Sequence, residues 1–247
     1  MILTGGVCRF DFLGPEILAA SSCREFANTD RGKFLSVLGL EEENLVLVRQ
    51  IHSANLIHVA AGPKEHSSSA ADGMVTREEG LVLGVLTADC VPVFFWDSDK
   101  RVAAIAHAGW KGIAQGIVPK VVQALRQNFR SKSHSVRVVL GPCIRQCCYE
   151  VGAEFQELFP SYFVERSLDG VPAGAASDQF QKEVENKGTV HLPAIVRDQL
   201  VEEGVDPEKI YDSGFCTSCH NDQFYSVRAE KDTKERMLSV ISIRPVR

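Results

Sequence analysis

The stretch LVLGVLTADCVPVFFWDSDKRVAAIAHAGWKG (residues 81–112) decides the fold. It holds three short apolar runs, at 81–90, 91–97 and 101–108. Runs of this length are too short for ordinary helices and are typical of strands buried on both faces. Cys90 and His107 lie at the ends of two of these runs. The pattern therefore predicts a buried sheet with a thiol and an imidazole at its rim, where loops collect functional groups.

The rest of the chain follows no regular βαβ alternation, and several expected strands follow one another directly. This order favours α+β layers over a doubly wound sheet. We expect one domain, residues 1–247, built as a layered α/β/β/α sandwich with mixed sheets. Further strands are expected within 44–60, with His52 near the middle, and at 135–142, 224–230 and 237–243. Helices are expected at 112–129, with Pro119 in a bend or first turn, and at 149–159 and 192–204, whereas 61–71 and 167–178 are polar loops.

Composition is that of an ordinary globular protein, because 45% of the 247 residues are hydrophobic and 24% are charged. A chain of this length buries enough surface to fold without disulfides or structural metals. Eight cysteines without an export signal are expected to be reduced thiols, metal ligands or a nucleophile. Any bound metal is then free to serve chemistry.

Charge and hydropathy exclude several partners. The formal net charge is -5 and no basic run occurs, so we expect no nucleic-acid or membrane partner. The first residues do not resemble a signal peptide, and no apolar stretch reaches the roughly 18 residues of a membrane span. We expect a cytoplasmic protein, monomeric or homodimeric.

Three short motifs contain most of the side chains suited to chemistry: QIHSAN (50–55), TADC (87–90) and HAGWKG (107–112). His52, Cys90 and His107 offer two imidazoles and a thiolate, three suitable ligands for Zn²⁺, with Cu²⁺ as an alternative. Three ligands leave a fourth position open, which is the catalytic arrangement and lowers the pKa of bound water to about 7. A lone histidine in a strand or a cysteine at its end is often a packing residue. The neighbouring Asp89, a predicted catalytic residue, and the glycines after His107 favour the metal site, because packing alone does not require them.

These motifs resemble those of the laccase-domain family, YfiH-like proteins also described as purine nucleoside phosphorylases of the polyphenol-oxidase type. The resemblance runs from about residue 28 to residue 243, whereas residues 1–27 depart from the family's opening. It implies that His52, Cys90 and His107 are metal ligands. The matching motifs are QIHSA (50–54), ADGMVT (71–76), LTADCVPV (86–93), HAGWKG (107–112), GPCI (141–144), CCYEVG (147–152), FCTSC (215–219) and FYSVR (224–228).

The resemblance implies phosphorolysis of adenosine, inosine, guanosine or 5'-methylthioadenosine, with adenosine deamination as a second activity. The expected partners are therefore a nucleoside and phosphate. The Gly-rich turn at HAGWKG opens a helix, whose amides together with Lys111 suit phosphate. Trp110 suits stacking on a base. Gln50 is a further predicted substrate contact, and the resemblance adds Arg228.

Two other activities compete with this prediction. In a cysteine hydrolase Cys90 would be the nucleophile and His107 its base, without metal, and hydrolytic editing of peptidoglycan precursors belongs to this class. A copper-dependent polyphenol oxidase is the other. Multicopper oxidases need four copper ions and many histidines, usually in His-x-His pairs, and none of the seven histidines here forms such a pair.

A second group of cysteines follows in the sequence. CTSCH (216–220) matches a c-type haem attachment pattern, but haem is attached outside the cytoplasm. One CxxC is half of a structural zinc site, so a zinc shared with the earlier cysteines is an alternative. We expect reduced thiols in tight turns around the mouth of the active site. The group is Cys143, Cys147, Cys148, Cys216 and Cys219.

Overall fold

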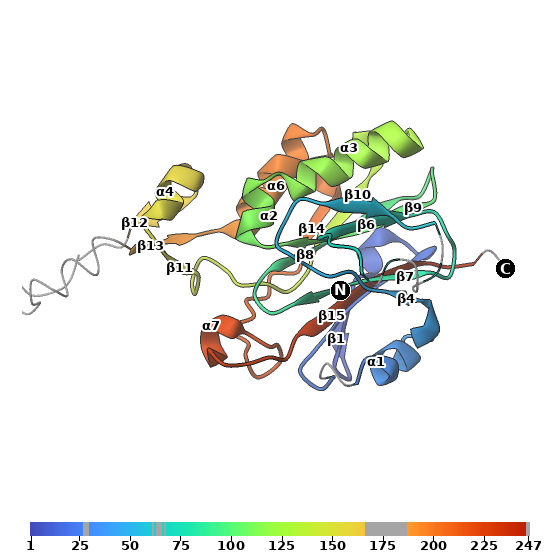
Figure 1. Cartoon of the computed structure of the whole chain (residues 1–247), viewed down its shortest axis with the longest axis horizontal. Helices are drawn as coiled ribbons and strands as arrows, with labels where there is room; N and C mark the ends of the chain where they lie inside the picture. The colour runs from blue at the N-terminus through green and yellow to red at the C-terminus, as the bar shows by residue number, and fades with distance from the viewer. Residues whose placement is uncertain (27–29, 61, 63–65, 67, 166–186, 246–247) are drawn as a thin grey trace, which may run out of the picture.

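Two six-stranded sheets form the body of the computed structural model, which describes residues 1–26, 30–60, 62, 66, 68–165 and 187–245 (Figure 1). The first sheet has the order β1 (Ile2–Thr4), β2 (Val7–Arg9), β3 (Ile17–Ser22), β15 (Met237–Ile243), β7 (Val82–Thr87), β4 (Leu45–Val46). The second has the order β14 (Ile210–Asp212), β10 (Arg137–Leu140), β8 (Val91–Asp97), β9 (Val102–Ala108), β6 (Gly73–Thr76), β5 (Leu56–His58). Both sheets mix parallel and antiparallel pairs.

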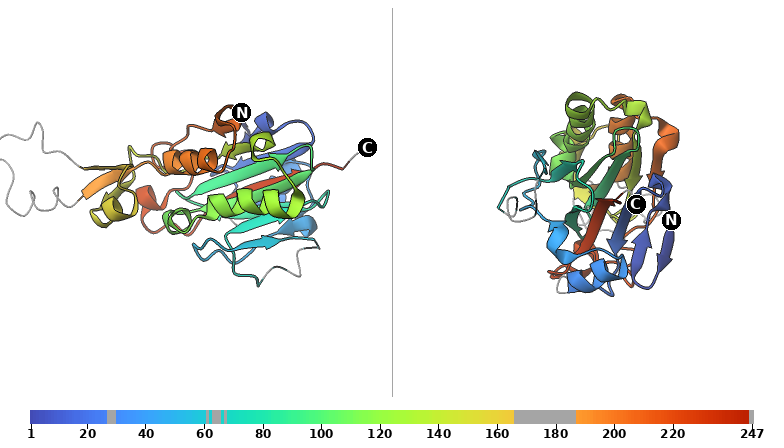
Figure 2. Two further views of the ribbon diagram at one scale, coloured as in Figure 1. Left: turned by 90° about the horizontal axis from the view of Figure 1, so that it is seen from above. Right: turned by 90° about the vertical axis from the view of Figure 1, so that its right-hand side faces the viewer.

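Helices cover the outer faces of both sheets. On the second sheet lie α2 (Trp110–Ala114), α3 (Ile117–Phe129) and α6 (Leu192–Glu202), and Figure 2 shows α3 and α6 lying along the strands. On the first sheet α1 (Arg31–Val37) buries two side chains, Phe34 and Leu35, against apolar residues of β15 and β3. The predicted α+β class and the α/β/β/α layering are therefore confirmed.

Successive side chains of the central strands contribute alternately to two parts of the hydrophobic core. In β8, Phe94 and Trp96 face the first sheet, whereas Val93 and Phe95 face the helices. Successive side chains of a strand point to opposite faces, so a strand covered on both sides must be apolar at every position. All seven residues of β8 and of β9 are buried. The prediction of doubly buried strands in the deciding stretch is confirmed.

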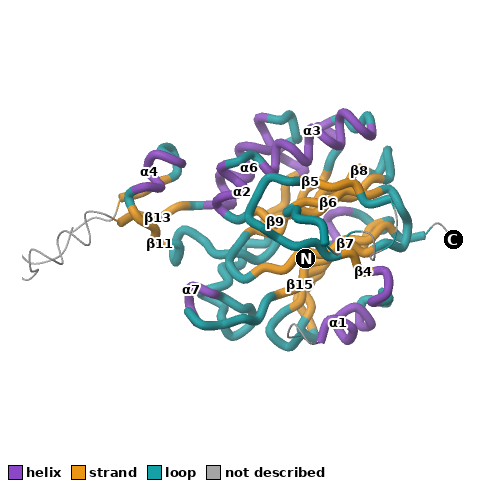
Figure 3. The backbone as a smooth tube through the Cα atoms, in the orientation of Figure 1, coloured by secondary structure: helices purple, strands orange, loops and turns teal. Residues whose placement is uncertain are grey.

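A smaller three-stranded sheet projects from this body (Figure 3). It has the order β11 (Glu150–Gly152), β13 (Lys187–Val190), β12 (Phe163–Glu165), and α4 (Glu154–Leu158) follows β11. The helix predicted at 149–159 was therefore wrong in its first part, because Glu150–Gly152 pairs with β13. The loop predicted at 167–178 lies outside the described residues. Within them, no helix combines the length and apolarity that crossing a membrane requires.

Two other predicted elements need correction. Residues 224–230 do not form a strand, since α7 (Val227–Glu230) begins where the Ser226 side chain accepts a hydrogen bond from the amide of Ala229. The predicted helix at 112–129 is two helices, because Gly116 has a φ of 79° and interrupts the ladder between α2 and α3. Pro119 lies in the first turn of α3, one of the two places predicted for it.

Candidate metal centre

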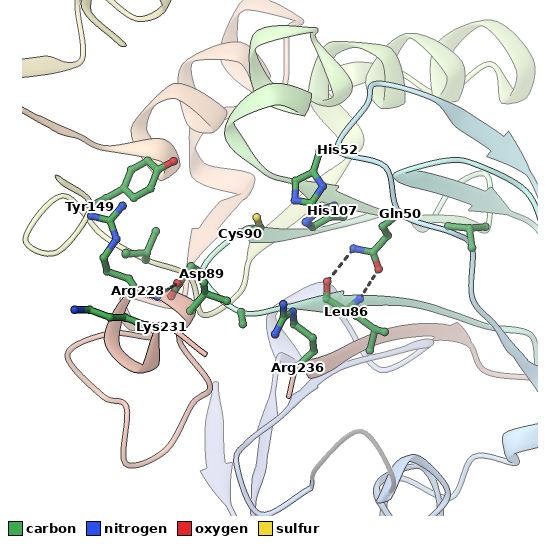
Figure 4. Close-up of a pocket in the computed structure, with 14 residues that line it drawn as sticks. Gln50, His52, Leu86, Asp89, Cys90, His107, Tyr149, Arg228, Lys231 and Arg236 are labelled. Atoms are coloured by element: carbon green, nitrogen blue, oxygen red, sulfur yellow. Dashed lines mark hydrogen bonds between the residues drawn. The ribbon is translucent and has the colours of Figure 1, made fainter. Parts of the chain in front are cut away.

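Three side chains from three separate segments meet at one end of the sheets. Cys90 follows β7, His107 lies near the end of β9, and His52 lies in the loop between β4 and β5. Their possible ligand atoms all lie within 4.8 Å of one another, and the two imidazole centroids are 4.8 Å apart with the rings nearly perpendicular. Figure 4 shows the Cys90 sulfur beside both rings. His52 was predicted within a strand, and this was wrong, since its φ is 56° and it belongs to a turn.

Asp72 holds two of these ligands in place. Its Oδ1 accepts hydrogen bonds from His107 Nδ1 at 2.8 Å and from the amide of His52 at 3.0 Å. Its Oδ2 accepts from the amide and the hydroxyl of Ser53, at 2.7 and 2.8 Å, and from the amide of Ile51 at 3.2 Å. The turn that carries His52 is thus wrapped around a buried carboxylate. Since Nδ1 of His107 donates to Asp72, its Nε2 is left for a metal.

The same contacts set the charges of the metal-free site. Burial opposes ionisation of the Cys90 thiol, but hydrogen bonds and charge from His107 and His52 lower its pKa to about 7. Burial likewise opposes charge on His107, but Asp72 and Cys90 raise its pKa to about 9. Burial alone would raise the pKa of Asp72, but hydrogen bonds from His107 and Ser53 lower it to about 2. A metal that binds here meets a readily formed thiolate and displaces a proton from His107.

Asp89 shapes the turn that presents Cys90. Its φ is 90°, a left-handed conformation that is costly for a residue other than glycine. Its side chain accepts two hydrogen bonds, from the Thr217 hydroxyl to Oδ1 at 2.7 Å and from the amide of Arg228 to Oδ2 at 2.8 Å. Its main-chain carbonyl accepts a third, from the amide of Ile144 at 2.9 Å. These bonds stabilise the strained turn. Asp89 therefore holds its neighbour in position, and its predicted catalytic role stays a prediction.

A cavity of about 770 Å³ opens above the three ligands. It joins the loop before β5, the ends of β7 and β9, and the segment around α7. Its lining comprises Val48, Gln50, His52, Leu86, Ala88, Asp89, Cys90, His107, Ile144, Tyr149, Val227, Arg228, Lys231 and Arg236.

The predicted substrate contacts separate into two groups. Gln50 and Arg228 line the cavity. The side-chain amide of Gln50 donates a hydrogen bond to the carbonyl of Leu86 and accepts one from its amide, both at 2.8 Å (Figure 4). Trp110 and Lys111 do not line it. Trp110 packs on Phe155 with ring centroids 5.0 Å apart, and Lys111 Nζ lies 5.4 Å from the Trp110 ring. Their roles in base stacking and phosphate binding stay predictions without support from this placement.

Comparison with known proteins identifies the family. The chain matches the family model of multi-copper polyphenol oxidoreductase laccases over residues 23–244. The chain belongs to this family. It is 32% identical over 198 residues to adenosine deaminase RL5 of an unknown prokaryotic organism, covering 77% of this chain and 72% of that protein. It is 31% identical over 185 residues to purine nucleoside phosphorylase YlmD of Bacillus subtilis (strain 168), and the match covers 74% of this chain and 63% of that protein.

Solved structures of relatives have the same fold. The crystal structure of YlmD from Geobacillus stearothermophilus aligns with a TM-score of 0.85 at 24% identity, covering 99% of this chain and 98% of that one. The predicted resemblance to this family is therefore confirmed. Its relatives carry the names of enzymes that act on purine nucleosides.

The donor set of the laccase-family centre fits one metal ion. Two imidazoles and one thiolate are ligands that zinc and copper both accept, and they leave one tetrahedral position open. Multicopper oxidation requires several ions, which three ligands cannot hold. Within the described part of the chain only one other group of three or more His, Cys, Asp or Glu side chains is close enough to hold an ion, and it contains no histidine.

Asp72 lies in the ADGMVT motif, and the sequence alone indicated no role for it. We expect Asp72→Asn to lower metal affinity by about 10–100-fold, because the single side-chain oxygen of asparagine can still accept from Ile51 and Ser53, whereas the charge that orients His107 and the acceptor of the His52 amide are lost. Titration of the metal-free protein with zinc measures this. Asp97→Asn is the matched control, since its buried carboxylate accepts main-chain amides at 3.0 and 3.2 Å far from the centre. Equal affinities of the two variants would contradict the role of Asp72.

The main chain at Gly109 passes close to the ligands. A Cβ here would lie 3.0 Å from Cys90 Sγ and 3.1 Å from His52 Cδ2. The backbone of Gly109, with φ -75° and ψ 163°, suits alanine, so the effect of Gly109→Ala is steric alone. We expect metal affinity to fall by about tenfold or more. Gly62→Ala is the control, since a Cβ there meets nothing within 4 Å, and unchanged zinc affinity in Gly109→Ala would contradict the close approach.

Proposed function

We propose that the protein is a zinc-dependent purine nucleoside phosphorylase, acting on adenosine, inosine, guanosine or 5'-methylthioadenosine, with adenosine deamination as a second activity. One observation carries the proposal. The cavity that contains His52, Cys90 and His107 is also lined by three cationic side chains, Arg228, Lys231 and Arg236. A centre that polarises a substrate and a cationic region that attracts phosphate thus lie within one cavity.

The cavity suits a nucleoside in size and lining. Small-molecule sites commonly occupy about 300–1,000 Å³ and combine apolar walls with a few polar groups. Val48, Leu86, Ile144 and Val227 supply apolar surface here. Tyr149 adds an aromatic ring, and burial raises the pKa of its phenol, so it remains a hydrogen-bond donor.

Two of the three cations, Arg228 and Arg236, are held in place by hydrogen bonds to the main chain. Arg228 Nη1 donates to the carbonyl of Glu150 at 2.6 Å, and its guanidinium lies 5.3 Å from the Tyr149 ring. Arg236 Nη1 donates to the carbonyls of Thr233 and Glu235 at 3.1 and 2.7 Å. Pre-ordered guanidinium groups with further N–H donors are suited to phosphate, which they bind by charge-assisted hydrogen bonds.

Each part of the site has a role in this proposal. Arg228, Lys231 and Arg236 bind and orient phosphate next to the sugar. Apolar side chains exclude water from the purine, so that phosphate rather than water reaches the glycosidic bond. His52, Cys90 and His107 hold the ion, which when bound supplies Lewis-acid polarisation of a substrate oxygen or of water.

Kinetics of base release test the proposal. We expect adenine or hypoxanthine to appear only when phosphate is present. Lys231→Ala and Arg236→Ala should each raise the KM for phosphate about tenfold or more, because each removes a hydrogen-bonded charge. Lys111→Ala is the comparison, and its KM for phosphate should not change. Base release at the same rate without phosphate would indicate a hydrolase, and an effect confined to Lys111→Ala would place the phosphate at α2.

A cysteine hydrolase is the second candidate, and the hydrogen bond between Asp72 and His107 favours it. Cys90, His107 and Asp72 make the nucleophile, base and orienting carboxylate of such an enzyme without any metal. The second imidazole distinguishes the two candidates. His52 adds a third ligand next to Cys90, which a cysteine hydrolase does not require and a metal centre does.

A further inference from the structure

A second cluster of cysteines lies outside the candidate metal centre. Cys147, Cys148, Cys216 and Cys219 come from two segments, and their sulfurs all lie within 4.8 Å of one another. The Cys219 sulfur is 3.5 Å from that of Cys147 and 3.3 Å from that of Cys148. All four are free thiols in this structure. The nucleoside reaction proposed above uses none of them.

Packing does not account for this cluster. Cysteine used as a packing residue is normally buried. Here Cys147 and Cys219 are exposed and Cys148 is only partly buried, whereas Cys216 alone is buried. Four thiols in mutual contact at a surface therefore need another explanation.

Hydrogen bonds independent of the thiols fix the two segments next to each other. An isolated parallel bridge joins Cys143 to Cys216, and the amide of Thr217 donates to the carbonyl of Cys143 at 3.0 Å. The Arg145 side chain donates to Asp212 at 2.7 Å and to the carbonyl of Phe215 at 3.3 Å. A metal would thus meet a site that is largely formed before it binds.

The Cys147–Cys148 segment forms a turn at this point. The amides of Cys148 and Tyr149 both donate to the carbonyl of Arg145 at 2.9 Å. This turn brings two consecutive sulfurs to one side, facing the CxxC pair Cys216 and Cys219. Two pairs of thiols from two segments are the usual composition of a structural zinc site.

We propose that Cys147, Cys148, Cys216 and Cys219 bind one zinc ion in a structural site separate from the centre at His52, Cys90 and His107. Four thiolates at about 2.3 Å from zinc lie about 3.8 Å from one another in a tetrahedron. The observed spacing, 3.3 and 3.5 Å for two pairs and at most 4.8 Å for all, brackets that value. Small side-chain rotations therefore suffice to form the tetrahedron.

Four protein ligands leave no open position, so this ion would have a structural rather than a catalytic role. The segments it would connect both support the candidate site. One carries Ile144 and Tyr149, which line the cavity, and the other carries Thr217, which holds Asp89 beside Cys90. The ion would thus clamp together the two chain segments that support the catalytic turn.

Metal analysis of the full chain tests the proposal. We expect about two zinc ions per chain in protein purified without added metal, one in Cys219→Ser, one in Cys90→Ser and none in the double variant. Cys143→Ala is the matched control, because this buried thiol precedes the cluster by four residues and is not part of it. Its zinc content should equal that of the unsubstituted protein. Full zinc content in Cys219→Ser would overturn the proposal.

Alkylation of the unsubstituted protein provides a second test that does not depend on folding of the variants. Cys147 and Cys219 are exposed, so without a metal they should react rapidly with iodoacetamide. We expect them to be protected until a chelator removes zinc. Immediate reaction in chelator-free protein would overturn the proposal, as would a disulfide between Cys219 and Cys147 or Cys148 found by non-reducing peptide mapping. Neither test measures base release, and the Cys219→Ser and alkylation results concern the cluster alone, so failure of this proposal is distinguishable from failure of the proposed phosphorylase activity.

Discussion

Protein that carries His107→Ala is expected to bind one metal ion per chain fewer than the unsubstituted protein and to lose base release altogether. His107 supplies one of three ligands, and its Nδ1 is bound to Asp72. Without the imidazole, two ligands remain, too few for a catalytic zinc site. Metal analysis and the nucleoside assay on the same preparation measure both losses.

The same substitution should also destabilise the metal-free fold. His107 and Asp72 form a buried pair, and breaking a buried pair by removing one partner costs about 3–5 kcal/mol. We expect a loss of stability at the lower end of this range, because Asp72 still accepts hydrogen bonds from the amides of Ile51, His52 and Ser53. Urea unfolding of the metal-free proteins measures the difference.

His58→Ala serves as the matched control for this prediction. His58 lies on β5, exposed, with its ring against Phe129 and away from the cavity. Its removal should leave metal content and base release unchanged. Full metal content in His107→Ala would show that the ion binds elsewhere and that His52, Cys90 and His107 are not its ligands.

The central strands could be predicted because their signal is local. Every residue of β8 is buried, so its sequence is apolar at each position and needs no knowledge of the rest of the chain. The antiparallel register of β8 and β9 pairs Pro92 with His107 and so brings the end of β9 close to Cys90. The pairing of two consecutive strands therefore suffices to bring two of the three ligands, Cys90 and His107, close together.

The role of Asp72 could not be predicted, because it depends on contacts distant in sequence. Asp72 lies 20 residues from His52 and 35 from His107, and its role appears only when the turn at 51–53 folds around it. The signal in the sequence was one acidic residue directly before an apolar strand in ADGMVT. A carboxylate in that position is expected to have buried partners.

The strand predicted at 224–230 failed for a related reason. Phe224, Tyr225 and Val227 favour a strand, but the hydroxyl of Ser226 caps α7 and the amide of Arg228 binds Asp89. Tertiary hydrogen bonds outweigh the local preference here. This turn directs the following loop, with Lys231 and Arg236, back to the cavity before β15 pairs with β7.

Alkylation of Cys90 distinguishes a metal ligand from a nucleophile. In metal-free protein the pKa of the Cys90 thiol is about 7, so iodoacetamide should modify it rapidly at neutral pH, faster than buried Cys143, whose pKa is raised by burial. In metal-loaded protein a thiolate that coordinates zinc should be protected. Peptide mapping assigns the modified residue separately from the cysteines of the second cluster.

The most direct test of the metal centre is therefore the rate of Cys90 alkylation at neutral pH before and after chelation, followed together with base release. We expect slow modification and full activity in zinc-loaded protein, then rapid modification once a chelator has removed the ion, with activity restored by zinc only where Cys90 was left unmodified. Rapid alkylation of Cys90 in fully metal-loaded protein, with activity lost in step, would contradict the metal centre and make Cys90 the nucleophile of a hydrolase.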